Sequence, residues 1–254
     1  MREPSASTDA PKLLEAGRAE FAILDIHDLG LARERGLDAV GVAPIIKRPL
    51  AAVIAADRNA VRRPRDLEGE TVGVTGLPSD DAVLDSVLRA DGADPAAVNR
   101  VTIGFQAVSA LASGKVSAAT GFWNAEGVAL RRQGIPIRVF KVDRYGAQPY
   151  PELVLTASRR TIEHDPGLVD TVVAATARGY ELASEHPARA LGDLLAAVPS
   201  LDRADQAAQL HALRPDLHPA RFDPAVLREW AAWDLKHGLL ERPLDVDEAF
   251  RLNP

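Results

Sequence analysis

Residues 14–23, Leu14-Glu-Ala-Gly-Arg-Ala-Glu-Phe-Ala-Ile, combine the end of a helix, a capping glycine, a basic residue and the start of a strand. Residues 111–120, Leu111-Ala-Ser-Gly-Lys-Val-Ser-Ala-Ala-Thr, repeat this order 97 positions later. A single glycine cap is common, because many helices end in the left-handed conformation that glycine adopts easily. Two copies indicate two lobes built from the same helix–strand unit. Coincidence in an alanine-rich sequence is the alternative.

Short apolar strands alternate with amphipathic helices over most of the chain. The expected strands are Glu20–Leu24, Val40–Ile46, Leu50–Ala55, Thr71–Thr75, Val101–Gly104, Ala118–Phe122, Ile137–Val142 and Leu153–Thr156. A helix is expected to start at Pro78 and to end at Gly92, with its apolar residues on one face. Strand–helix alternation with short connections predicts an α/β fold with a largely parallel sheet.

The chain changes character at Thr161, after which only helices are expected. Asp165-Pro166 is an N-cap followed by proline at the first helical position, and it starts a helix that runs to about Ser184. Further helices are expected from His186, over Asp202–Leu213 and from Asp223 to Leu240. We expect this region to pack around a sheet, because it contains no strand of its own.

Composition excludes several classes of protein. The 254 residues include 46% apolar and 26% charged residues, the net charge is −6, and no concentrated basic face of the kind that binds nucleic acid is present. The absence of cysteine excludes disulfides, thiolate metal sites and cysteine nucleophiles. No apolar run approaches the roughly 20 residues that span a bilayer, and Met1 is not followed by a signal-peptide pattern.

Several stretches carry a resemblance to a known family. They are residues 9–23, Lys47-Arg-Pro-Leu, Asp66-Leu-Glu-Gly-Glu-Thr-Val-Gly-Val, Gly104-Phe, Ala110-Leu-Ala-Ser-Gly-Lys-Val, Phe122-Trp-Asn-Ala-Glu-Gly-Val and Asp143-Arg-Tyr-Gly-Ala-Gln-Pro-Tyr-Pro-Glu-Leu-Val-Leu. Together they resemble the thiamine-precursor (pyrimidine-binding) branch of the solute-binding proteins of bacterial ABC importers. This branch also includes the fungal pyrimidine synthases of thiamine biosynthesis. The resemblance covers residues 9–198.

The resemblance implies a type II periplasmic-binding-protein fold, in which two α/β lobes are joined by hinge segments and the ligand is buried in the cleft. The crossings would lie near Val61–Asp66 and Val142–Pro151. The first lobe would contain residues 1–66 and 143–254, with the C-terminal helices packed on it, and the second lobe residues 67–142.

One departure from the family pattern concerns the start of the first lobe. Relatives begin with a strand, a helix and a second strand before the helix that matches Pro11–Ala16. Only residues 1–10 stand in that place here. We therefore expect exposed strand edges in the first lobe, because unpaired edges result from such a loss. We also expect the second lobe to be the better ordered half.

The function implied by the resemblance is solute binding for an ABC importer, with permease and ATPase subunits as partners and an extracytoplasmic location. A thiamine-related aminopyrimidine is the expected ligand. The alternatives are a flavin, an organosulfonate or nitrate. A pyrimidine-precursor synthase is disfavoured, because the fungal relatives use a cysteine-rich iron site and this chain has no cysteine. No catalytic residue and no cofactor are expected.

The best candidate site follows the strand Ala118–Phe122, at a strand end where open α/β sheets bind ligands. Trp123 would stack on a flat ring, and Glu126 would accept from an amino group or a protonated ring nitrogen. Asn124 lies between them and is included in the site. The alternative is that Trp123 belongs to the core and that Glu126 is a first-turn charge favoured by the helix dipole.

Three further groups of residues are candidates. Ser79 and Asp80 follow a strand at a helix start, where free amides bind polar groups; an ordinary serine cap is an equally good interpretation. Asp25 and His27 would share one face of a continuing strand. Without another histidine nearby, a polar cleft contact or an N-cap is favoured over a metal site. Tyr145 and Tyr150 either close over a ligand ring or pack the second hinge.

Overall fold

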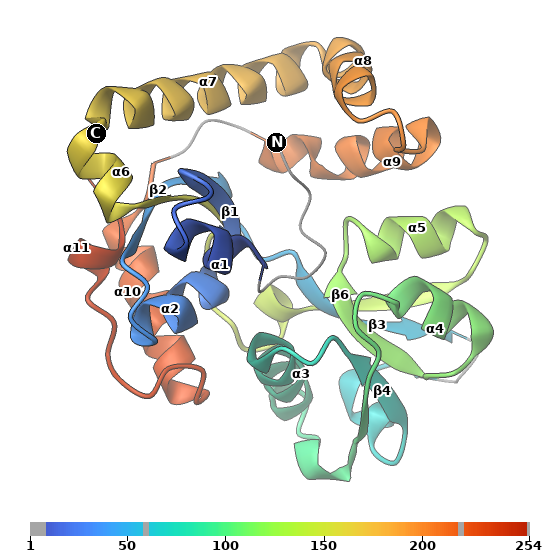
Figure 1. The fold of residues 1–254 in the computed structure, drawn as a ribbon. Helices are drawn as coiled ribbons and strands as arrows, with labels where there is room; N and C mark the ends of the chain where they lie inside the picture. The colour runs from blue at the N-terminus through green and yellow to red at the C-terminus, as the bar shows by residue number, and fades with distance from the viewer. Residues whose placement is uncertain (1–8, 58–60, 218–220, 253–254) are drawn as a thin grey trace. The chain divides into compact units, whose positions relative to one another are not determined.

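The computed structural model describes residues 9–57, 61–217 and 221–252, which form two compact units (Figure 1). Unit 1 contains Met1–Arg48, Gln148–Ala190 and Pro215–Pro254, and unit 2 contains Pro49–Ala147 and Leu191–Arg214. The chain first passes from unit 1 to unit 2 at Pro49, which is earlier than the crossing expected near Val61–Asp66. The return at Gln148 lies inside the expected segment Val142–Pro151.

Unit 1 contains a three-stranded sheet with the order β1–β8–β2. Its strands are β1 (Phe21–Asp25), β2 (Ala39–Ile46) and β8 (Leu153–Ser158). Helix α2 (Ile26–Glu34) connects β1 to β2, and these two strands run in the same direction. β8 lies between them and is antiparallel to both. The prediction of a largely parallel sheet is wrong here, because β8 enters the sheet at the edge where β1 and β2 end.

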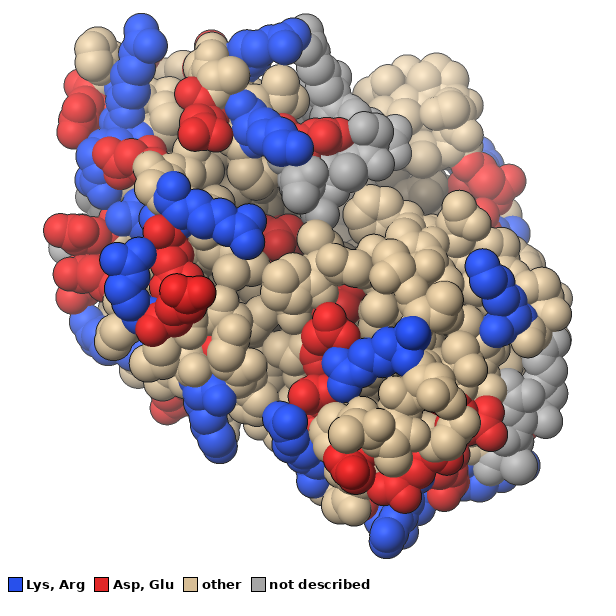
Figure 2. Space-filling model, turned by 60° about the horizontal axis from the view of Figure 1, so that its bottom comes forward, with Lys and Arg blue, Asp and Glu red and all other residues tan. Residues whose placement is uncertain are grey.

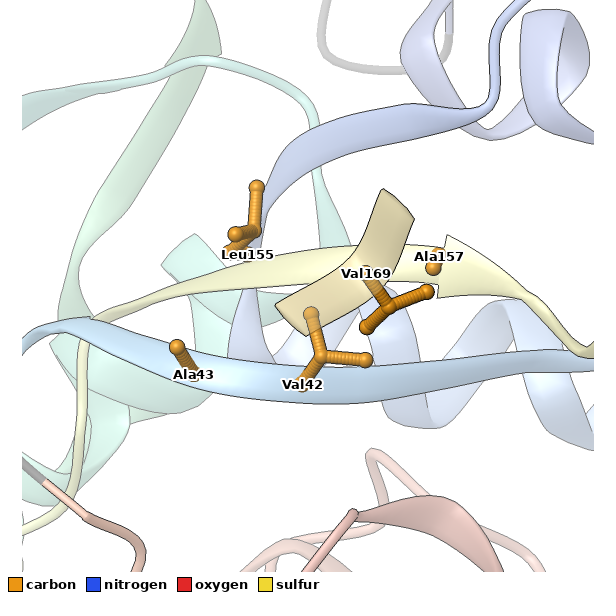
Figure 3. Packing of buried hydrophobic residues seen from close by; sticks show 5 residues of the cluster. All are labelled: Val42, Ala43, Leu155, Ala157 and Val169. Carbon is orange, nitrogen blue, oxygen red and sulfur yellow. The ribbon is translucent and has the colours of Figure 1, made fainter. Parts of the chain in front are cut away.

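The core of unit 1 packs helix α7 (Pro166–Glu185) against the sheet, as Figure 3 shows. The buried residues of this cluster are Val42 and Ala43 from β2, Leu155 and Ala157 from β8, and Val169 from α7. Helix α6 (Arg159–His164) connects β8 to α7. Alternate residues of β8 face this cluster, so the intervening residues Val154 and Thr156 are turned to the opposite side of the sheet.

Helices α10 (Pro224–Lys236) and α11 (Val246–Ala249) complete unit 1. Trp230 of α10 is fully buried and lies against α2, where a Cβ on Gly30 would be 3.3 Å from the indole ring. Phe250 closes tightly on Gly41 of β2, where an added Cβ would lie 2.6 Å from the phenyl ring. The C-terminal segment is therefore an integral part of the core of unit 1.

Unit 2 contains a five-stranded sheet with the order β5–β4–β6–β3–β7. Its strands are β3 (Ala51–Ala56), β4 (Thr71–Val74), β5 (Asn99–Thr102), β6 (Ala118–Phe122) and β7 (Ile137–Lys141). β4 is parallel to β5 and β6, whereas β3 is antiparallel to β6 and β7. The sheet is thus mixed rather than largely parallel, because β3 enters unit 2 beside the end of β6, where Ala51 pairs with Phe122.

Three helices follow the parallel strands of unit 2. They are α3 (Pro78–Ala90), α4 (Ala107–Ser113) and α5 (Glu126–Arg132). The apolar face predicted for α3 is confirmed, since Val83, Leu84, Val87 and Leu88 are all buried. β4, β5 and β6 run in the same direction, so the loops that lead into these helices gather at one edge of the sheet.

The order of helix end, glycine, basic residue and strand that occurs twice in the sequence is a structural repeat. Helix α1 (Asp9–Glu15) in unit 1 and α4 in unit 2 both end at a left-handed glycine, Gly17 with φ 61° and Gly114 with φ 77°. The next residue closes the same bond in each copy: Arg18 N donates to Leu13 O at 2.9 Å, and Lys115 N donates to Ala110 O at 3.0 Å. A strand then starts at Phe21 or Ala118. Each unit therefore contains one copy.

The remaining C-terminal helices do not all pack where the sequence analysis placed them. Helices α7, α10 and α11 belong to unit 1, as expected for a helical region on the first lobe. Helix α9 (Arg203–Leu213) instead packs against α5 in unit 2, and Arg132 bonds Asp202 across this contact at 3.3 Å. Helix α8 (Pro187–Ala197) lies at the boundary.

Candidate functional site

The end of β6 in unit 2 holds Trp123 in a fixed orientation. Its backbone N–H donates to Leu50 O at 3.0 Å, and its indole Nε1–H donates to Pro49 O at 3.1 Å. The side chain is 8% exposed, and the ammonium of Lys141 lies 3.6 Å from the ring centroid. This cation–π contact occupies one face of the indole. A ligand ring would have to stack on the other face or contact the edge.

Glu126 shapes the turn between β6 and α5. Its Oε2 atom accepts from Phe122 N at 2.8 Å, and an added Cβ on Gly121 would lie 3.3 Å from the same oxygen. The carboxylate therefore already holds the end of β6 against the first turn of α5. A direct contact of Glu126 with a ligand remains a prediction.

Asn124 has a polar atom that protein groups do not satisfy. The side chain is 6% exposed, and its Oδ1 atom has no hydrogen-bond partner within the described residues. Buried polar atoms are normally hydrogen-bonded, so an exception at a strand end points to a ligand or water contact. Of the three residues predicted in this segment, Asn124 has the clearest capacity for a new bond.

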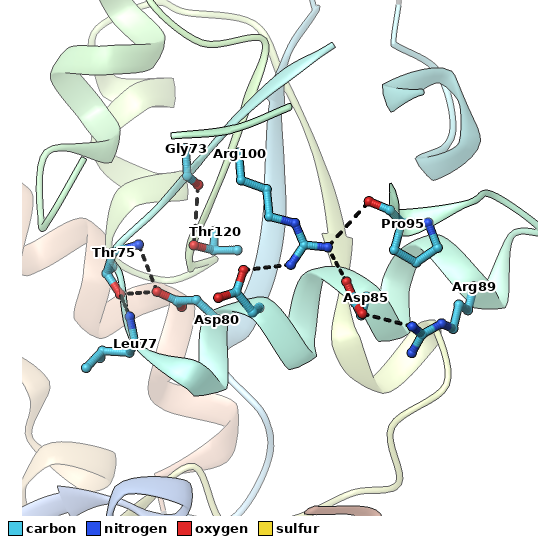
Figure 4. A network of polar contacts seen from close by, with 10 residues as sticks. Gly73, Thr75, Leu77, Asp80, Asp85, Arg89, Pro95, Arg100 and Thr120 are labelled. Carbon is cyan, nitrogen blue, oxygen red and sulfur yellow. Dashed lines mark hydrogen bonds and ion pairs between the residues drawn. The ribbon is translucent and has the colours of Figure 1, made fainter. Parts of the chain in front are cut away.

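The loop between β4 and α3 is organised by Asp80 rather than by Ser79 (Figure 4). Leu77 is the N-cap of α3 and makes no side-chain cap bond, so the serine-cap interpretation of Ser79 is wrong. Asp80 accepts from Thr75 N at 2.9 Å and from the Thr75 hydroxyl. Burial raises the pKa of Asp80, although these hydrogen bonds oppose the rise. The backbone N–H of Thr75 in this loop is thus already bonded to an acidic side chain, which disfavours a phosphate ligand there.

Two aromatic side chains near this part of unit 2 differ in accessibility. Tyr145 packs edge-on against Phe140, with ring centroids 5.8 Å apart, and its carbonyl accepts from Ser86 Oγ at 3.0 Å. Phe105, between β5 and α4, is 66% exposed. It lies in the Gly104-Phe segment and at the same sheet edge as Trp123, but the sequence analysis did not select it. An exposed ring at this edge is a further candidate for ligand stacking.

In unit 1, the residues at the end of β1 form a polar centre. β1 ends at Asp25 and α2 begins at Ile26, so the strand does not continue through His27 as the alternation argument assumed. Asp25 is the N-cap of α2 and accepts from His27 N at 2.7 Å, which confirms the N-cap interpretation. Burial raises the pKa of Asp25 well above its usual value; the charge of His27 opposes the rise, and Glu152 adds to it. Glu152 immediately precedes β8 and is 1% exposed.

His27 forms a buried ion pair with a residue 207 positions away. Its Nδ1 atom lies 2.7 and 2.9 Å from the two carboxylate oxygens of Asp234, and the side chains are 1% and 0% exposed. Burial opposes a charged imidazole, but the charge and hydrogen bond of Asp234, followed by the charges of Asp25 and Glu152, raise the pKa of His27 from 6.5 to about 10. His27 is therefore an imidazolium at neutral pH.

Aromatic rings surround this imidazolium. Tyr150 meets it edge-on with centroids 4.9 Å apart, and Trp233 lies at 5.7 Å and Trp230 at 6.1 Å. Within the described residues, His27 Nε2 and Trp233 Nε1 are buried without a hydrogen-bond partner. The predicted residues Asp25, His27 and Tyr150 are thus brought together. The α10 residues and Glu152 were missed, because no local pattern connects α10 to the end of β1.

The polar residues His27 in unit 1 and Asn124 in unit 2 occupy equivalent places in the structural repeat. Gly17 and Gly114 are 97 positions apart, and the same separation relates His27 to Asn124. Each residue lies just after the repeated strand, and each has a buried polar atom without a partner in the described chain. Both units therefore hold a polar side chain with an unpartnered atom at the same position of the repeat.

Other types of site receive no support from the described residues. Residues 9–57, 61–217 and 221–252 contain no group of three or more His, Asp and Glu side chains arranged to hold a metal ion. None of the helices in these ranges is long and apolar enough to cross a membrane. On the face that Figure 2 shows, Lys and Arg side chains are interspersed with Asp and Glu, so this face lacks the concentrated basic surface that nucleic acids require.

Comparisons with known proteins show what the chain is similar to as a whole. The chain is 29% identical to the formylaminopyrimidine-binding protein of Halalkalibacterium halodurans over 97% of its own length and 78% of that protein. It is 28% identical to the riboflavin-binding protein RibY of Chloroflexus aurantiacus over 91% of this chain and 68% of the relative.

The fold matches that of solved binding proteins. The alkanesulfonate-binding protein SsuA of Xanthomonas axonopodis pv. citri superposes with a TM-score of 0.81 at 20% identity, covering 98% of this chain and 86% of that one. This likeness confirms the predicted periplasmic-binding-protein fold. The family model described as NMT1/THI5 like matches residues 1–190. The chain therefore belongs to the NMT1/THI5-like family.

Proposed function

We propose that the protein is the solute-binding component of an ABC importer and that its ligand is a thiamine-related aminopyrimidine. The observation that carries the proposal is the similarity to a formylaminopyrimidine-binding protein over nearly the whole chain. Binding makes and breaks no covalent bond. An extracytoplasmic location and permease and ATPase partners follow from this role and belong to the proposal.

The side chains at the strand ends of unit 2 support a small aromatic ligand with hydrogen-bonding groups. Trp123 and Phe105 offer rings for stacking, and Asn124 offers an acceptor atom that has no partner in the described part of the chain. Ligand sites of this kind are mainly apolar and carry a few polar groups that fix orientation. An aminopyrimidine has both a flat face and a polar edge.

The acidic side chains argue against an anionic ligand. Asp25 and Glu152 lie at the end of β1, and Asp80 lies in the β4–α3 loop. A sulfonate or nitrate would require arginine or several free amides, whereas the amide of Thr75 is already bonded to Asp80. A flavin remains the second candidate, because the riboflavin-binding relative is similar over 91% of the chain. An enzyme resembling the fungal synthases is disfavoured, since the chain contains no cysteine.

Thermal unfolding with a ligand panel tests the proposal. The panel contains formylaminopyrimidine, riboflavin, an alkanesulfonate and nitrate, each at several concentrations. A ligand at about 100 times its Kd stabilises the folded protein by about 2.7 kcal/mol, which raises Tm by about 5 to 10 °C for a chain of this size. We expect this rise with formylaminopyrimidine alone. A rise with riboflavin or the sulfonate, and none with formylaminopyrimidine, would refute the proposed ligand.

A further inference from the structure

The indole N–H of Trp233 on α10 differs from those of the other tryptophans. Trp123 Nε1–H donates to Pro49 O at 3.1 Å, and Trp230 Nε1 lies 3.2 Å from His27 Nδ1. Trp233 is 7% exposed, yet its Nε1 atom has no hydrogen-bond partner in the described part of the chain. Buried indole N–H groups usually find a partner. This exception therefore indicates a donor that is kept for a molecule other than the protein itself.

The fold holds Trp233 beside the polar residues that follow β1. The ring of His237, one turn further along α10, stacks on the indole with centroids 4.1 Å apart and an interplanar angle of 28°. The rings of His27 and Tyr150 lie 5.7 and 6.5 Å from the indole. Asp234, the next residue, forms the buried ion pair with His27 at 2.7 Å. All of these residues belong to unit 1, so the indole has a fixed place within one compact unit.

A second buried nitrogen without a partner lies in the neighbouring ring. His27 is 1% exposed, and its Nε2 atom has no partner among the described residues. His27 stands in the first turn of α2, directly after β1, and strand ends of this kind are where α/β sheets bind ligands. Two such atoms, in neighbouring rings of two different helices, indicate a place that is prepared for hydrogen bonds to a ligand.

We infer that Trp233 contacts the ligand and that its indole N–H donates to an acceptor atom of a solute bound at the end of β1. This inference rests on the proposed function and adds to it a contact from α10, a helix outside residues 1–190 that the family model matches. An indole N–H only donates, so the solute must present an acceptor to it. A formylaminopyrimidine has acceptors in its ring nitrogens and its formyl oxygen.

The indole signals of the unmodified protein test this contact directly. The chain has three tryptophans, so protein labelled with ¹⁵N-tryptophan gives three indole N–H signals, which are assigned by triple-resonance experiments. At saturation with formylaminopyrimidine, we expect the Trp233 indole proton to move downfield. We also expect its exchange with water to slow at least about 10-fold, because exchange requires the new hydrogen bond to open. A Trp233 signal that keeps its position at saturation overturns the inference.

A pair of variants on α10 tests the same contact by calorimetry. Trp233→Phe removes the N–H donor and keeps an aromatic ring, and we expect it to weaken formylaminopyrimidine by about 3- to 10-fold, as for the loss of one hydrogen bond. The matched control is Leu235→Ala, because Leu235 lies on the same helix and is 37% exposed. The control should leave the affinity unchanged. A folded Trp233→Phe variant that binds as tightly as the control overturns the inference.

The outcomes separate the inference from the proposed function. Wild-type protein that binds formylaminopyrimidine with an unmoved Trp233 signal overturns the inference and leaves the proposed function intact. Protein that binds riboflavin instead, with the Trp233 signal moved downfield, refutes the proposed ligand and supports the contact. Protein that binds no solute of the panel overturns both. If Trp233→Phe does not fold, the indole spectra still decide, because they use the wild-type chain.

Discussion

Replacing Asp234 with asparagine removes the negative charge that compensates the buried imidazolium of His27. The side chains are 0% and 1% exposed and approach within 2.7 Å, so water cannot take over the role of the carboxylate. Breaking a buried ion pair by removing one partner costs about 3 to 5 kcal/mol. The pKa of His27 gives a similar figure: a value of about 10 in the folded state against 6.5 corresponds to at most about 5 kcal/mol.

The sign of the pH dependence follows from the same pKa. The folded protein binds the His27 proton more tightly than the unfolded chain, so this stabilisation is complete below pH 6.5 and is lost as the pH rises through about 10. The charges around His27 are Asp234 on α10, Asp25 at the end of β1 and Glu152 before β8. In the Asp234→Asn variant, burial favours the neutral imidazole, and stability should change much less between pH 7 and pH 10.

Urea unfolding at several pH values, combined with an NMR titration of His27, measures both effects. The control is Asp247→Asn, because the ion pair of Asp247 with Arg228 is exposed on both sides and contributes at most about 1 kcal/mol. We expect the buried variant to lose about 3 to 5 kcal/mol at pH 7 and the control less than about 1. An Asp234→Asn variant as stable as the control, or a wild-type His27 that titrates near pH 6.5, would refute the reasoning.

Three further predictions concern other parts of the molecule. Trp123→Ala should lower ligand affinity at least about 10-fold while the fold survives, whereas Trp123→Phe should keep part of the stacking; calorimetry that shows unchanged affinity for the alanine variant excludes Trp123 from the site. Gly41→Ala should destabilise unit 1 by about 1 to 3 kcal/mol, because its Cβ would lie 2.6 Å from Phe250. Gly192→Ala on α8 has open space and should be neutral or stabilising in the same unfolding assay, so equal losses in both variants would contradict the packing argument. Amides of β1, an edge strand with Ile23 53% exposed, should exchange with solvent faster than those of the central strand β6; equal protection would contradict the expected difference in order between the units.

Sequence patterns predicted the elements of this fold better than their directions. The strand Ala118–Phe122 and the apolar face of α3 follow from local periodicity, and both are present as predicted. The antiparallel placement of β3 and β8 was missed, because it depends on where the chain enters each sheet after leaving the other unit. Local patterns contain no information about that path.

The candidate site, like the fold, could be predicted from local patterns only in part. Asp25, His27 and Tyr150 were selected from short motifs and do lie together in unit 1. Asp234 was not selected, because it lies 207 positions from His27 on a helix whose sequence reads as an ordinary amphipathic segment. Glu126 was selected for its charge, but only the structure shows that its carboxylate holds the turn at Phe122.

Direct titration of the purified chain with formylaminopyrimidine, followed by isothermal calorimetry, tests the central claim. The similarity to a formylaminopyrimidine-binding protein predicts one saturable site with a micromolar or tighter Kd, which corresponds to about −8 kcal/mol or a more negative free energy of binding. The same titration with riboflavin should give no saturable heat. Saturable binding of riboflavin together with no binding of formylaminopyrimidine at millimolar concentration would contradict the account.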